Sequence, residues 1–282
     1  MDNLFTTFEF FEKVLHQIIL GVVQGLTEFL PISSTAHLTV VPSLLGWGDP
    51  GLTTIASIQL GSIFAVLIYF RRDLFQIAKG FSLLFLKDRP NNSYSRLAMA
   101  ILIGNIPIVF CGGLIKLFWV NYEHSFLRSI PFIAFISIVM AIILALSDNS
   151  GNKLRELENI GARDGLLIGL SQVLAVIPGV SRSGITISTS LLSGLNRASA
   201  ARFSFLLGVP AITLAGLVEI KEAFSHFSYS DIVLLLIGIL SAAITSWLSI
   251  DFLIKYLKRY SMSVFVYYRL FFGIFILIWY YS

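Results

Sequence analysis

Charged residues are scarce in this sequence, and their scarcity excludes a water-soluble protein. Asp, Glu, Lys and Arg together make up 13% of the 282 residues, whereas hydrophobic residues make up 56%. A typical soluble domain is about 25% charged. The chain has too little polar surface to cover a soluble fold of this size, which excludes a soluble enzyme and predicts an integral membrane protein.

Cysteine is almost absent, and so are the sequence motifs of most soluble enzymes. The single cysteine, Cys111, lies in an apolar stretch, allows no internal disulfide and points to no redox or metal chemistry. There is no Walker motif, no His- or Cys-based metal spacing and no Gly-x-Ser-x-Gly elbow. The net charge of +4 comes from basic residues scattered through short connections, so we expect no nucleic-acid partner.

Long apolar runs are abundant. Six of them have about 17 to 22 residues, the length that a helix needs to cross the roughly 30 Å hydrocarbon core of a bilayer. These runs are 52–70, 97–118, 129–147, 203–220, 231–250 and 263–281. Residues 1–13 lack the features of a signal peptide and are expected to form a short amphipathic segment at the membrane surface. The predicted fold class is an all-α, polytopic helix bundle in a membrane.

Two further apolar regions, 14–45 and 165–195, are interrupted by proline and hydroxyl residues and resemble each other. Each contains a glutamine, then a proline, then a serine nine positions after the glutamine: Gln24 to Ser33 and Gln172 to Ser181. A similar offset relates a Leu-Gly pair in the helix that follows each region. Matching features in the same order indicate an internal duplication.

Paired, broken apolar segments are typical of membrane proteins with inverted repeats, whose sites lie near the bilayer midplane. Non-helical backbone at that depth is tolerated only where protein or a wet cavity surrounds it. We therefore predict one membrane domain over 1–282, with inverted-topology repeats at about 14–147 and 165–282. Regions 14–45 and 165–195 are predicted to be re-entrant helix hairpins whose tips meet inside the protein.

The distribution of basic residues predicts an orientation. The loops 71–96, 148–164, 195–202 and 255–260 hold 14 of the 20 Lys and Arg residues, so the positive-inside rule places these loops in the cytoplasm. Both termini are then expected on the outer face. Two arginines, Arg182 and Arg269, are left within apolar segments.

The first tip contains several residues suited to phosphate chemistry. Gln24 and Glu28 are four positions apart, so they share a helix face, and a proline ends that helix. Ser33 or Ser34 can cap the next helix, whose N-terminal N–H groups favour an anion such as phosphate. His37 lies on the first turn of that helix.

The second tip, Pro178 to Thr186, contains an arginine. The planar guanidinium of Arg182 can bind two phosphate oxygens at once, and Ser181, Ser183 and Thr186 add hydrogen-bond donors. The two tips are expected to form one pocket with a carboxylate, an imidazole, a guanidinium and several hydroxyls. That set of groups suits phosphoryl transfer.

These residues also have purely structural interpretations. Glu28 and Arg182 could form a buried ion pair that only locks the two repeats together. The serines could be helix caps or contacts between helices. An isolated histidine such as His37 is more often a hydrogen-bonded internal residue than a catalyst.

The two tips resemble the motifs of the undecaprenyl-diphosphatase family, the bacitracin-resistance type of membrane phosphatase. The family's (Glu/Gln)-x-x-x-Glu motif stands here as Gln24–Glu28, followed by Pro-x-Ser-Ser-Thr-x-His as Pro31–His37. Its second motif, Pro-Gly-x-Ser-Arg-Ser-x-x-Thr, stands as Pro178–Thr186. Motif order, spacing and chain length agree over essentially the whole chain. One departure is that Gln24 leaves a single carboxylate at the first tip.

The resemblance implies a membrane phosphatase that hydrolyses undecaprenyl diphosphate to undecaprenyl phosphate and inorganic phosphate. Such an enzyme recycles the lipid carrier of bacterial cell-wall synthesis, including that of peptidoglycan, and confers bacitracin resistance. It is expected in the bacterial cytoplasmic (inner) membrane, with its site open to the periplasmic, outer face and a divalent cation, Mg²⁺ or Ca²⁺, as cofactor. The expected partners are the polyprenyl diphosphate substrate and membrane lipids, and a homodimer is compatible with the resemblance.

The resemblance also assigns roles to individual residues. Ser34 is the implied nucleophile, although the sequence leaves open whether Ser34 or His37 takes the phosphoryl group. Glu28 is implied as a metal ligand, together with Gln24, or as a base. The implied diphosphate-binding residues are Arg182, Ser33, Ser181, Ser183 and Thr186.

Two other functions compete with this one. Inverted repeats with broken helices are also typical of transporters, so a flippase or a transporter of an anionic substrate is the alternative. Transport without phosphate release would decide for it. An enzyme of the phosphatidic-acid-phosphatase type is set aside, because the sequence has no Pro-Ser-Gly-His block.

Overall fold

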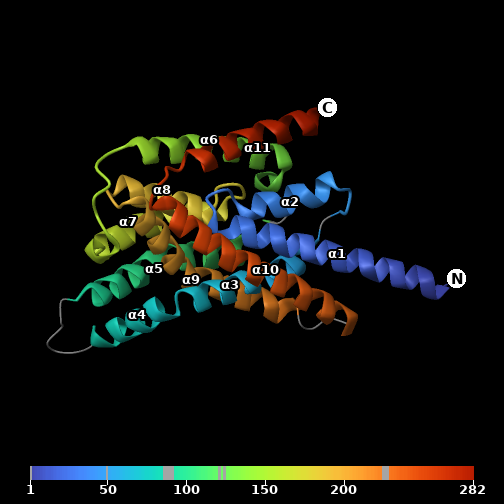
Figure 1. Cartoon of the computed structure of the whole chain (residues 1–282), viewed down its shortest axis with the longest axis horizontal. Helices are drawn as coiled ribbons and strands as arrows, with labels where there is room; N and C mark the ends of the chain where they lie inside the picture. The colour runs from blue at the N-terminus through green and yellow to red at the C-terminus, as the bar shows by residue number, and fades with distance from the viewer. Residues whose placement is uncertain (1, 49, 85–91, 120–121, 123–124, 224–228) are drawn as a thin grey trace.

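The computed structural model describes residues 2–48, 50–84, 92–119, 122, 125–223 and 229–282, and the regular elements in these ranges are helices (Figure 1). The all-α prediction is confirmed. The α-helices are α1 (Asp2–Phe29), α2 (Ser34–Leu44), α3 (Leu52–Tyr69), α4 (Arg71–Leu83), α5 (Ser93–Phe118), α6 (Ile130–Asn149), α7 (Ala162–Gln172), α8 (Arg182–Leu192), α9 (Arg197–Ala223), α10 (Tyr229–Leu257) and α11 (Ser263–Tyr281). Short 3₁₀ turns are η2 (Phe126–Arg128), η3 (Leu157–Asn159) and η4 (Val173–Val176).

Five helices in the described part of the chain are long and apolar enough to cross a membrane. They are α5, α6, the stretch Arg197–Gly216 of α9, the stretch Ile232–Leu257 of α10, and α11. These match five of the six predicted spans. The sixth, 52–70, matches α3, which turns by 77° into α4 after Tyr69. The chain is therefore a multi-pass membrane protein.

The N-terminal segment is part of a longer helix. Residues 2–13 are the first part of α1 and continue without a break into its later turns, because no proline or glycine interrupts the chain before Gly21. A helix of 28 residues is about 42 Å long, more than the roughly 30 Å of hydrocarbon requires. The first broken region therefore has one long arm, α1, and one short arm, α2, which has 11 residues.

The packing of helices repeats between the two halves of the chain. α1 packs along α10, and α7 packs along α5. A glycine permits the close approach in each pair. A Cβ added at Gly21 would lie 2.4 Å from the carbonyl oxygen of Gly238 on α10, and one at Gly169 would lie 2.2 Å from that of Gly104 on α5. Gly21 and Gly169 occupy equivalent positions of the predicted repeat. In each pair, a helix of one half packs against a helix of the other half, as we expect if the two halves are related.

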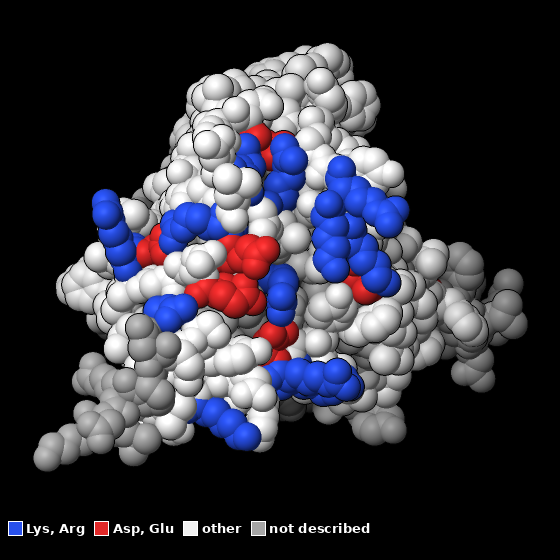
Figure 2. All heavy atoms as spheres, turned by 60° about the vertical axis from the view of Figure 1, so that its left-hand side comes forward, with Lys and Arg blue, Asp and Glu red and all other residues white. Residues whose placement is uncertain are grey.

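Charged side chains gather on the face that Figure 2 shows, which is the left-hand end of Figure 1. Residues from all four loops predicted to share one side line a cavity there, among them Asp73, Glu156, Arg202 and Lys258. Arg202 Nη2 lies 2.8 Å from Asp73 Oδ1 and joins two of these loops. α1 begins and α11 ends on the opposite side (Figure 1). The described loops thus lie together as the charge pattern predicts; residues 85–91, which include two of the counted basic residues, lie outside the described ranges.

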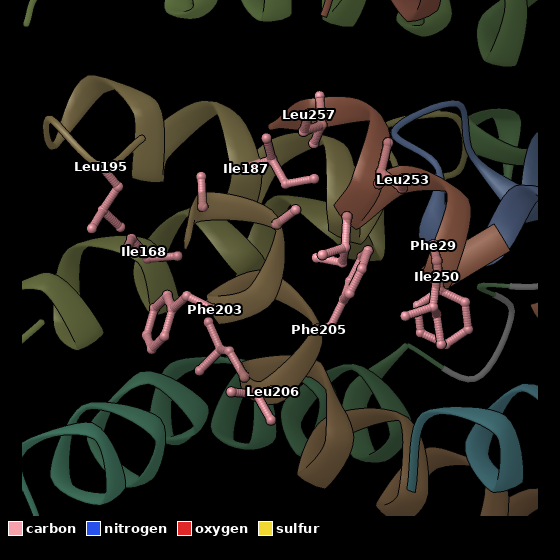
Figure 3. Close-up of a cluster of buried hydrophobic side chains, with 14 of the residues drawn as sticks. Phe29, Ile168, Ile187, Leu195, Phe203, Phe205, Leu206, Ile250, Leu253 and Leu257 are labelled. Atoms are coloured by element: carbon pink, nitrogen blue, oxygen red, sulfur yellow. The ribbon is translucent and has the colours of Figure 1, made fainter. Parts of the chain in front are cut away.

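The main hydrophobic core surrounds the N-terminal half of α9 (Figure 3). Phe203, Phe205 and Leu206 of α9 are fully buried and belong to one cluster with Phe29 of α1 and Ile187 of α8. The rings of Phe29 and Phe205 meet edge to face, with centroids 5.2 Å apart. Edge-to-face packing of such rings is favourable. The core therefore holds both broken regions against a single helix, next to their tips.

Candidate active site

Each broken region turns at a serine with an unusual backbone conformation. Ser33 has φ 77° and Ser181 has φ 71°, and they are the two non-glycine residues with positive φ among those described. L-residues rarely adopt this conformation, because Cβ crowds the backbone. Each serine caps the helix that follows: Ser33 Oγ accepts from the Ala36 N–H at 3.4 Å, and Ser181 Oγ accepts from the Gly184 N–H at 3.1 Å. The two tips thus have the same local structure.

One cavity of about 230 Å³ lies between the two tips. α2 and α8 both begin at its wall, and the first N–H groups of a helix carry partial positive charge and lack intrahelical partners. The cavity is therefore suited to an anion. The predicted site residues in its lining are Gln24, Glu28, Ser33, Ser34, Ser181 and Arg182.

Glu28 connects three of these residues. Its Oε2 accepts a hydrogen bond of 2.7 Å from Ser34 Oγ and one of 3.2 Å from Gln24 Nε2. Its Oε1 lies 3.2 Å from Nη2 of Arg182. Gln24 Nε2 also donates to Ser62 Oγ at 3.3 Å, which fixes the amide. The carboxylate is thus placed to accept the proton of Ser34, while a guanidinium compensates its charge.

Arg182 reaches the cavity from the second tip. Its Nη1 donates to the Ser204 carbonyl at 3.2 Å, whereas Nε is buried and has no partner among the described residues. The side chain lies flat against α9, where a Cβ added at Gly208 would lie 1.6 Å from Nη1. This contact explains why glycine is required in the repeated Leu-Gly pair of the second half. Arg182 belongs to the cavity wall, where its guanidinium adds positive charge that favours an anion such as phosphate.

The remaining hydroxyls of the second tip bond to protein rather than line the cavity. Ser183 Oγ donates to the Leu30 carbonyl at 3.0 Å and the Glu28 carbonyl at 3.3 Å, across the two tips. Thr186 Oγ1 donates to the Arg182 carbonyl at 2.7 Å and lies 2.6 Å from Ser204 Oγ. Ser183 and Thr186 therefore hold the backbone of the two tips and α9 together behind the site and are not in the cavity lining. Ser181, which caps α8, is at the wall itself.

His37 lies behind the first tip, 5% exposed. Its Nδ1 is 2.7 Å from the Ser33 carbonyl, which can only accept, so Nδ1 carries a proton. Its Nε2 is 2.7 Å from Tyr268 Oη, and its ring stacks on Phe272 at 4.1 Å between centroids. Both ring nitrogens are thus engaged by protein groups, in an arrangement that holds the Ser33 carbonyl.

Arg269 of α11 is an intramembrane arginine to which the sequence assigns no role. It is 1% exposed, and its hydrogen bonds go to backbone carbonyls. Nη1 donates to Pro31 at 3.0 Å, Nη2 to Gly179 at 2.6 Å and Nε to Ser137 at 3.2 Å. One side chain therefore holds the backbones of both tips. The sequence gives one indication that Arg269 matters. A charged residue within an apolar span is energetically unfavourable and is normally found only where it has a function.

The donors at the site fit a divalent cation only in part. The described residues contain no group of three or more His, Cys, Asp and Glu side chains that could hold a metal. Among the described residues of the cavity wall, Glu28 is the only carboxylate. Mg²⁺ is often bound by one or two carboxylates together with substrate phosphates. The donor set therefore fits a cation that is shared with a diphosphate and does not fit one held by protein alone.

Known proteins resemble this chain over nearly its whole length. The family model described as "Bacitracin resistance protein BacA" matches residues 17–275. The chain belongs to the BacA family. A relative from Prochlorococcus marinus (strain MIT 9303) is 55% identical over 282 residues, which are 100% of this chain and 96% of that protein. A relative from Synechococcus sp. (strain CC9311) is 56% identical over 268 residues, 95% of each chain. Both BacA relatives are named undecaprenyl-diphosphatase, so the resemblance drawn from the two tips is confirmed.

Proposed function

We propose that this chain hydrolyses undecaprenyl diphosphate to undecaprenyl phosphate and inorganic phosphate, and so recycles the lipid carrier of cell-wall synthesis and confers bacitracin resistance. The observation that carries the proposal is the Ser34–Glu28–Arg182 cluster at the wall of a cavity between two helix N-termini. A nucleophile next to a base and a bidentate cation is what phosphoryl transfer requires. Membership of the BacA family supports the same function.

The geometry supports a two-step reaction. Ser34 Oγ, whose proton passes to Glu28, attacks the terminal phosphorus; the bond from that phosphorus to the bridging oxygen breaks, and undecaprenyl phosphate leaves. Glu28 gives that proton to the leaving bridging oxygen and is ionised again. It then takes a proton from a water molecule, which attacks the phosphoserine; the bond from phosphorus to Ser34 Oγ breaks, Oγ takes the proton from Glu28, and inorganic phosphate is released. Arg182 and the N–H groups of α2 and α8 stabilise the charge on the phosphate oxygens.

Ser34 is a better nucleophile than His37 on geometric grounds. Ser34 is part of the cavity wall and bonds to a carboxylate. His37 has one nitrogen on the Ser33 carbonyl and the other on Tyr268. We therefore assign His37 to positioning the first tip.

A divalent cation, Mg²⁺ or Ca²⁺, is part of the proposal. Glu28, with Gln24 beside it, would hold the cation together with the substrate's phosphates. When bound, the cation neutralises charge on the phosphate oxygens.

The rest of the cavity wall suits the lipid part of the substrate. Apolar side chains lie beside the polar ones, among them Leu38, Ile55, Ile108 and Ile212. They would contact the first isoprenoid units, while the rest of the chain stays in the bilayer. Placing the charged face in the cytoplasm of a bacterial inner membrane puts both ends of the chain on the periplasmic side, toward which we propose the site opens. A homodimer stays a prediction, which the mass of the protein in detergent would test.

Phosphate release from undecaprenyl diphosphate by the purified protein tests this function, with and without Mg²⁺ or Ca²⁺. Arg182→Ala should abolish release, whereas Arg259→Ala, at an exposed position away from the cavity, should not. Absence of release from folded wild-type protein, with substrate transport in proteoliposomes, would decide for the transporter instead.

A further inference from the structure

Gln172, the last residue of α7, has no assigned role and is unusual in its surroundings. It is 0% exposed, yet neither its amide nitrogen nor its amide oxygen has a hydrogen-bond partner among the described residues. It belongs to the wall of the same cavity as Glu28, Ser34 and Arg182. Buried polar groups without partners are rare and destabilising, and each calls for an explanation.

The equivalent residue of the first repeat shows the contrast. Gln24 and Gln172 each precede the capping serine of their tip by nine positions. Gln24 Nε2 is used within the protein, where it donates to Glu28 and Ser62. Both ends of the Gln172 amide are unused among the described residues. The two predicted repeats therefore differ at this position. Gln24 orients the Glu28 carboxylate, whereas the amide of Gln172 has no hydrogen bond among the described residues.

The local structure holds Gln172 in this place. α7 changes at Gln172 into the 3₁₀ turn η4, whereas α1 continues for five residues beyond Gln24. Gly169, one turn earlier, lies directly against Gly104 of α5, and this contact fixes the distance between α7 and α5. This packing holds the backbone of α7 beside the cavity. Because the Gln172 amide is buried there without a partner, we expect its partner to be a molecule bound in the cavity.

The chemistry of the amide defines that partner. The nitrogen donates, and phosphate oxygens only accept when fully ionised. The amide oxygen accepts, and it is a hard oxygen donor of the kind that Mg²⁺ and Ca²⁺ prefer. A diphosphate with its divalent cation would satisfy both ends at once. Neither a lipid tail nor a diphosphate alone would do so.

We propose that Gln172 binds the diphosphate of the substrate, with Nε2 donating to a phosphate oxygen and Oε1 facing the accompanying cation. This proposal rests on the proposed function and adds a fourth polar contact to Glu28, Ser34 and Arg182. Gln172 belongs to the second predicted repeat, as Arg182 does, so both repeats would contribute polar groups that bind the diphosphate.

Gln172→Met tests the proposal, because methionine has a similar length and no strong hydrogen-bonding group. The probe is farnesyl methylenebisphosphonate, a lipid diphosphate that cannot be hydrolysed, with Mg²⁺. Without the probe, the variant should melt at the wild-type temperature or above it, because two unsatisfied groups are gone. The rise in melting temperature on adding probe and Mg²⁺ should be lost, and KM for undecaprenyl diphosphate should rise on the order of 10- to 100-fold.

Gln17→Met is the matched control. Gln17 on α1 also has a buried amide oxygen without a partner among the described residues, but it lies against α10 and outside the cavity wall. Its replacement should leave the probe-induced shift and KM unchanged. Gln172→Glu provides a second variant of the same size, in which a carboxylate replaces the donor. Its probe-induced shift should be lost without Mg²⁺ and partly recovered with Mg²⁺.

A Gln172→Met protein that is destabilised without the probe but keeps the full shift and the wild-type KM would overturn the proposal and make Gln172 a packing residue. If that variant does not fold, a Gln172→Glu shift equal to wild type in both conditions overturns the proposal in the same way. Wild-type protein that releases no phosphate would instead remove the proposed function itself, so the two failures can be told apart.

Discussion

Glu28 and Arg182 are 154 positions apart in the sequence and form an ion pair across the two tips, with 3.2 Å between Oε1 and Nη2. Their side chains are 9% and 11% exposed. A buried pair of this kind can serve structure, catalysis or both, because removing either partner leaves the other charge unpaired in a poorly solvated place. The contribution to catalysis has to be separated from the contribution to stability.

A double replacement separates them. Arg182→Met alone should lower the free energy of unfolding by about 3–5 kcal/mol, since Glu28 is left buried and unpaired. Glu28→Gln together with Arg182→Met removes both charges and should recover most of the melting temperature, but phosphate release should stay below detection. A stable and active double variant would show that the pair only locks the repeats together.

Replacing Ser34 tests the nucleophile. Ser34→Ala should reduce kcat by at least about 10³-fold, because the second step depends on the first. The control is Ser171→Ala, at an equally half-buried serine whose hydroxyl donates only within α7, to Ile168 at 2.7 Å. Acid quenching of the wild-type reaction should leave phosphate on Ser34, because phosphoserine survives acid and phosphohistidine does not. If the phosphate on the quenched wild-type enzyme were acid-labile and Ser34→Ala kept its turnover, His37 and not Ser34 would be the nucleophile.

Tyr268→Phe tests whether His37 acts by position. The change removes the hydroxyl 2.7 Å from His37 Nε2 and leaves the stacked rings in place. Loss of one such hydrogen bond corresponds to about 1 kcal/mol, so activity should fall by less than about tenfold. The pH dependence of kcat should keep its wild-type shape. A loss as large as that of Ser34→Ala, or an altered pH profile, would point to proton transfer by His37.

Stability should depend on pH through Asp164, at the start of α7. Burial raises the pKa of this carboxyl, but the hydrogen bonds from Arg155, at 2.9 and 2.7 Å, and from the Gly161 N–H outweigh it and hold the pKa below its ordinary value. Such a group stabilises the fold above its unfolded pKa, and the contribution is lost as pH falls through the folded pKa. Asp164→Asn should therefore lower the melting temperature at pH 7.

The difference between wild type and Asp164→Asn should disappear once the pH is well below 3.8, the ordinary value for Asp. Glu12→Gln is the control, since Glu12 is 55% exposed and its partner His16 lies 3.8 Å away. It should change the melting temperature little at either pH. A gap between Asp164→Asn and wild type that does not depend on pH would show that the effect is steric rather than electrostatic.

The sequence predicts the two tips well because their signals are local. A proline ends a helix and a serine begins the next one, and both follow from the backbone chemistry of a few adjacent residues. The repeated spacing then predicts that Ser34 and Arg182 lie at one site, since they occupy equivalent positions of the predicted repeat, and both line the same cavity. The apolar runs predict the spans for the same reason: length and hydrophobicity are sufficient.

The remaining features depend on contacts that are distant in the sequence. Nothing near Arg269 shows that its guanidinium spans two tips, and nothing near His37 shows that Tyr268 occupies its second nitrogen. The continuation of residues 2–13 into α1 is a further feature that the sequence analysis does not predict, although the backbone has no breaker before Gly21. The positive φ of Ser33 and Ser181 is likewise imposed by packing around the tips rather than by the residue type.

Arg269 gives the most demanding test of how the tips are held. Arg269→Lys keeps the charge but has a single nitrogen, which cannot reach both the Pro31 and the Gly179 carbonyls. The variant should melt at a lower temperature, because each buried carbonyl left unpaired costs about 1–3 kcal/mol, and its kcat should fall at least about tenfold as Ser34 and Arg182 lose their relative position. KM should change less than kcat, since Arg269 is outside the cavity wall. Arg163→Lys, at an exposed arginine, is the control. Wild-type melting and kcat in Arg269→Lys would mean that the tips are held by the core around α9 alone.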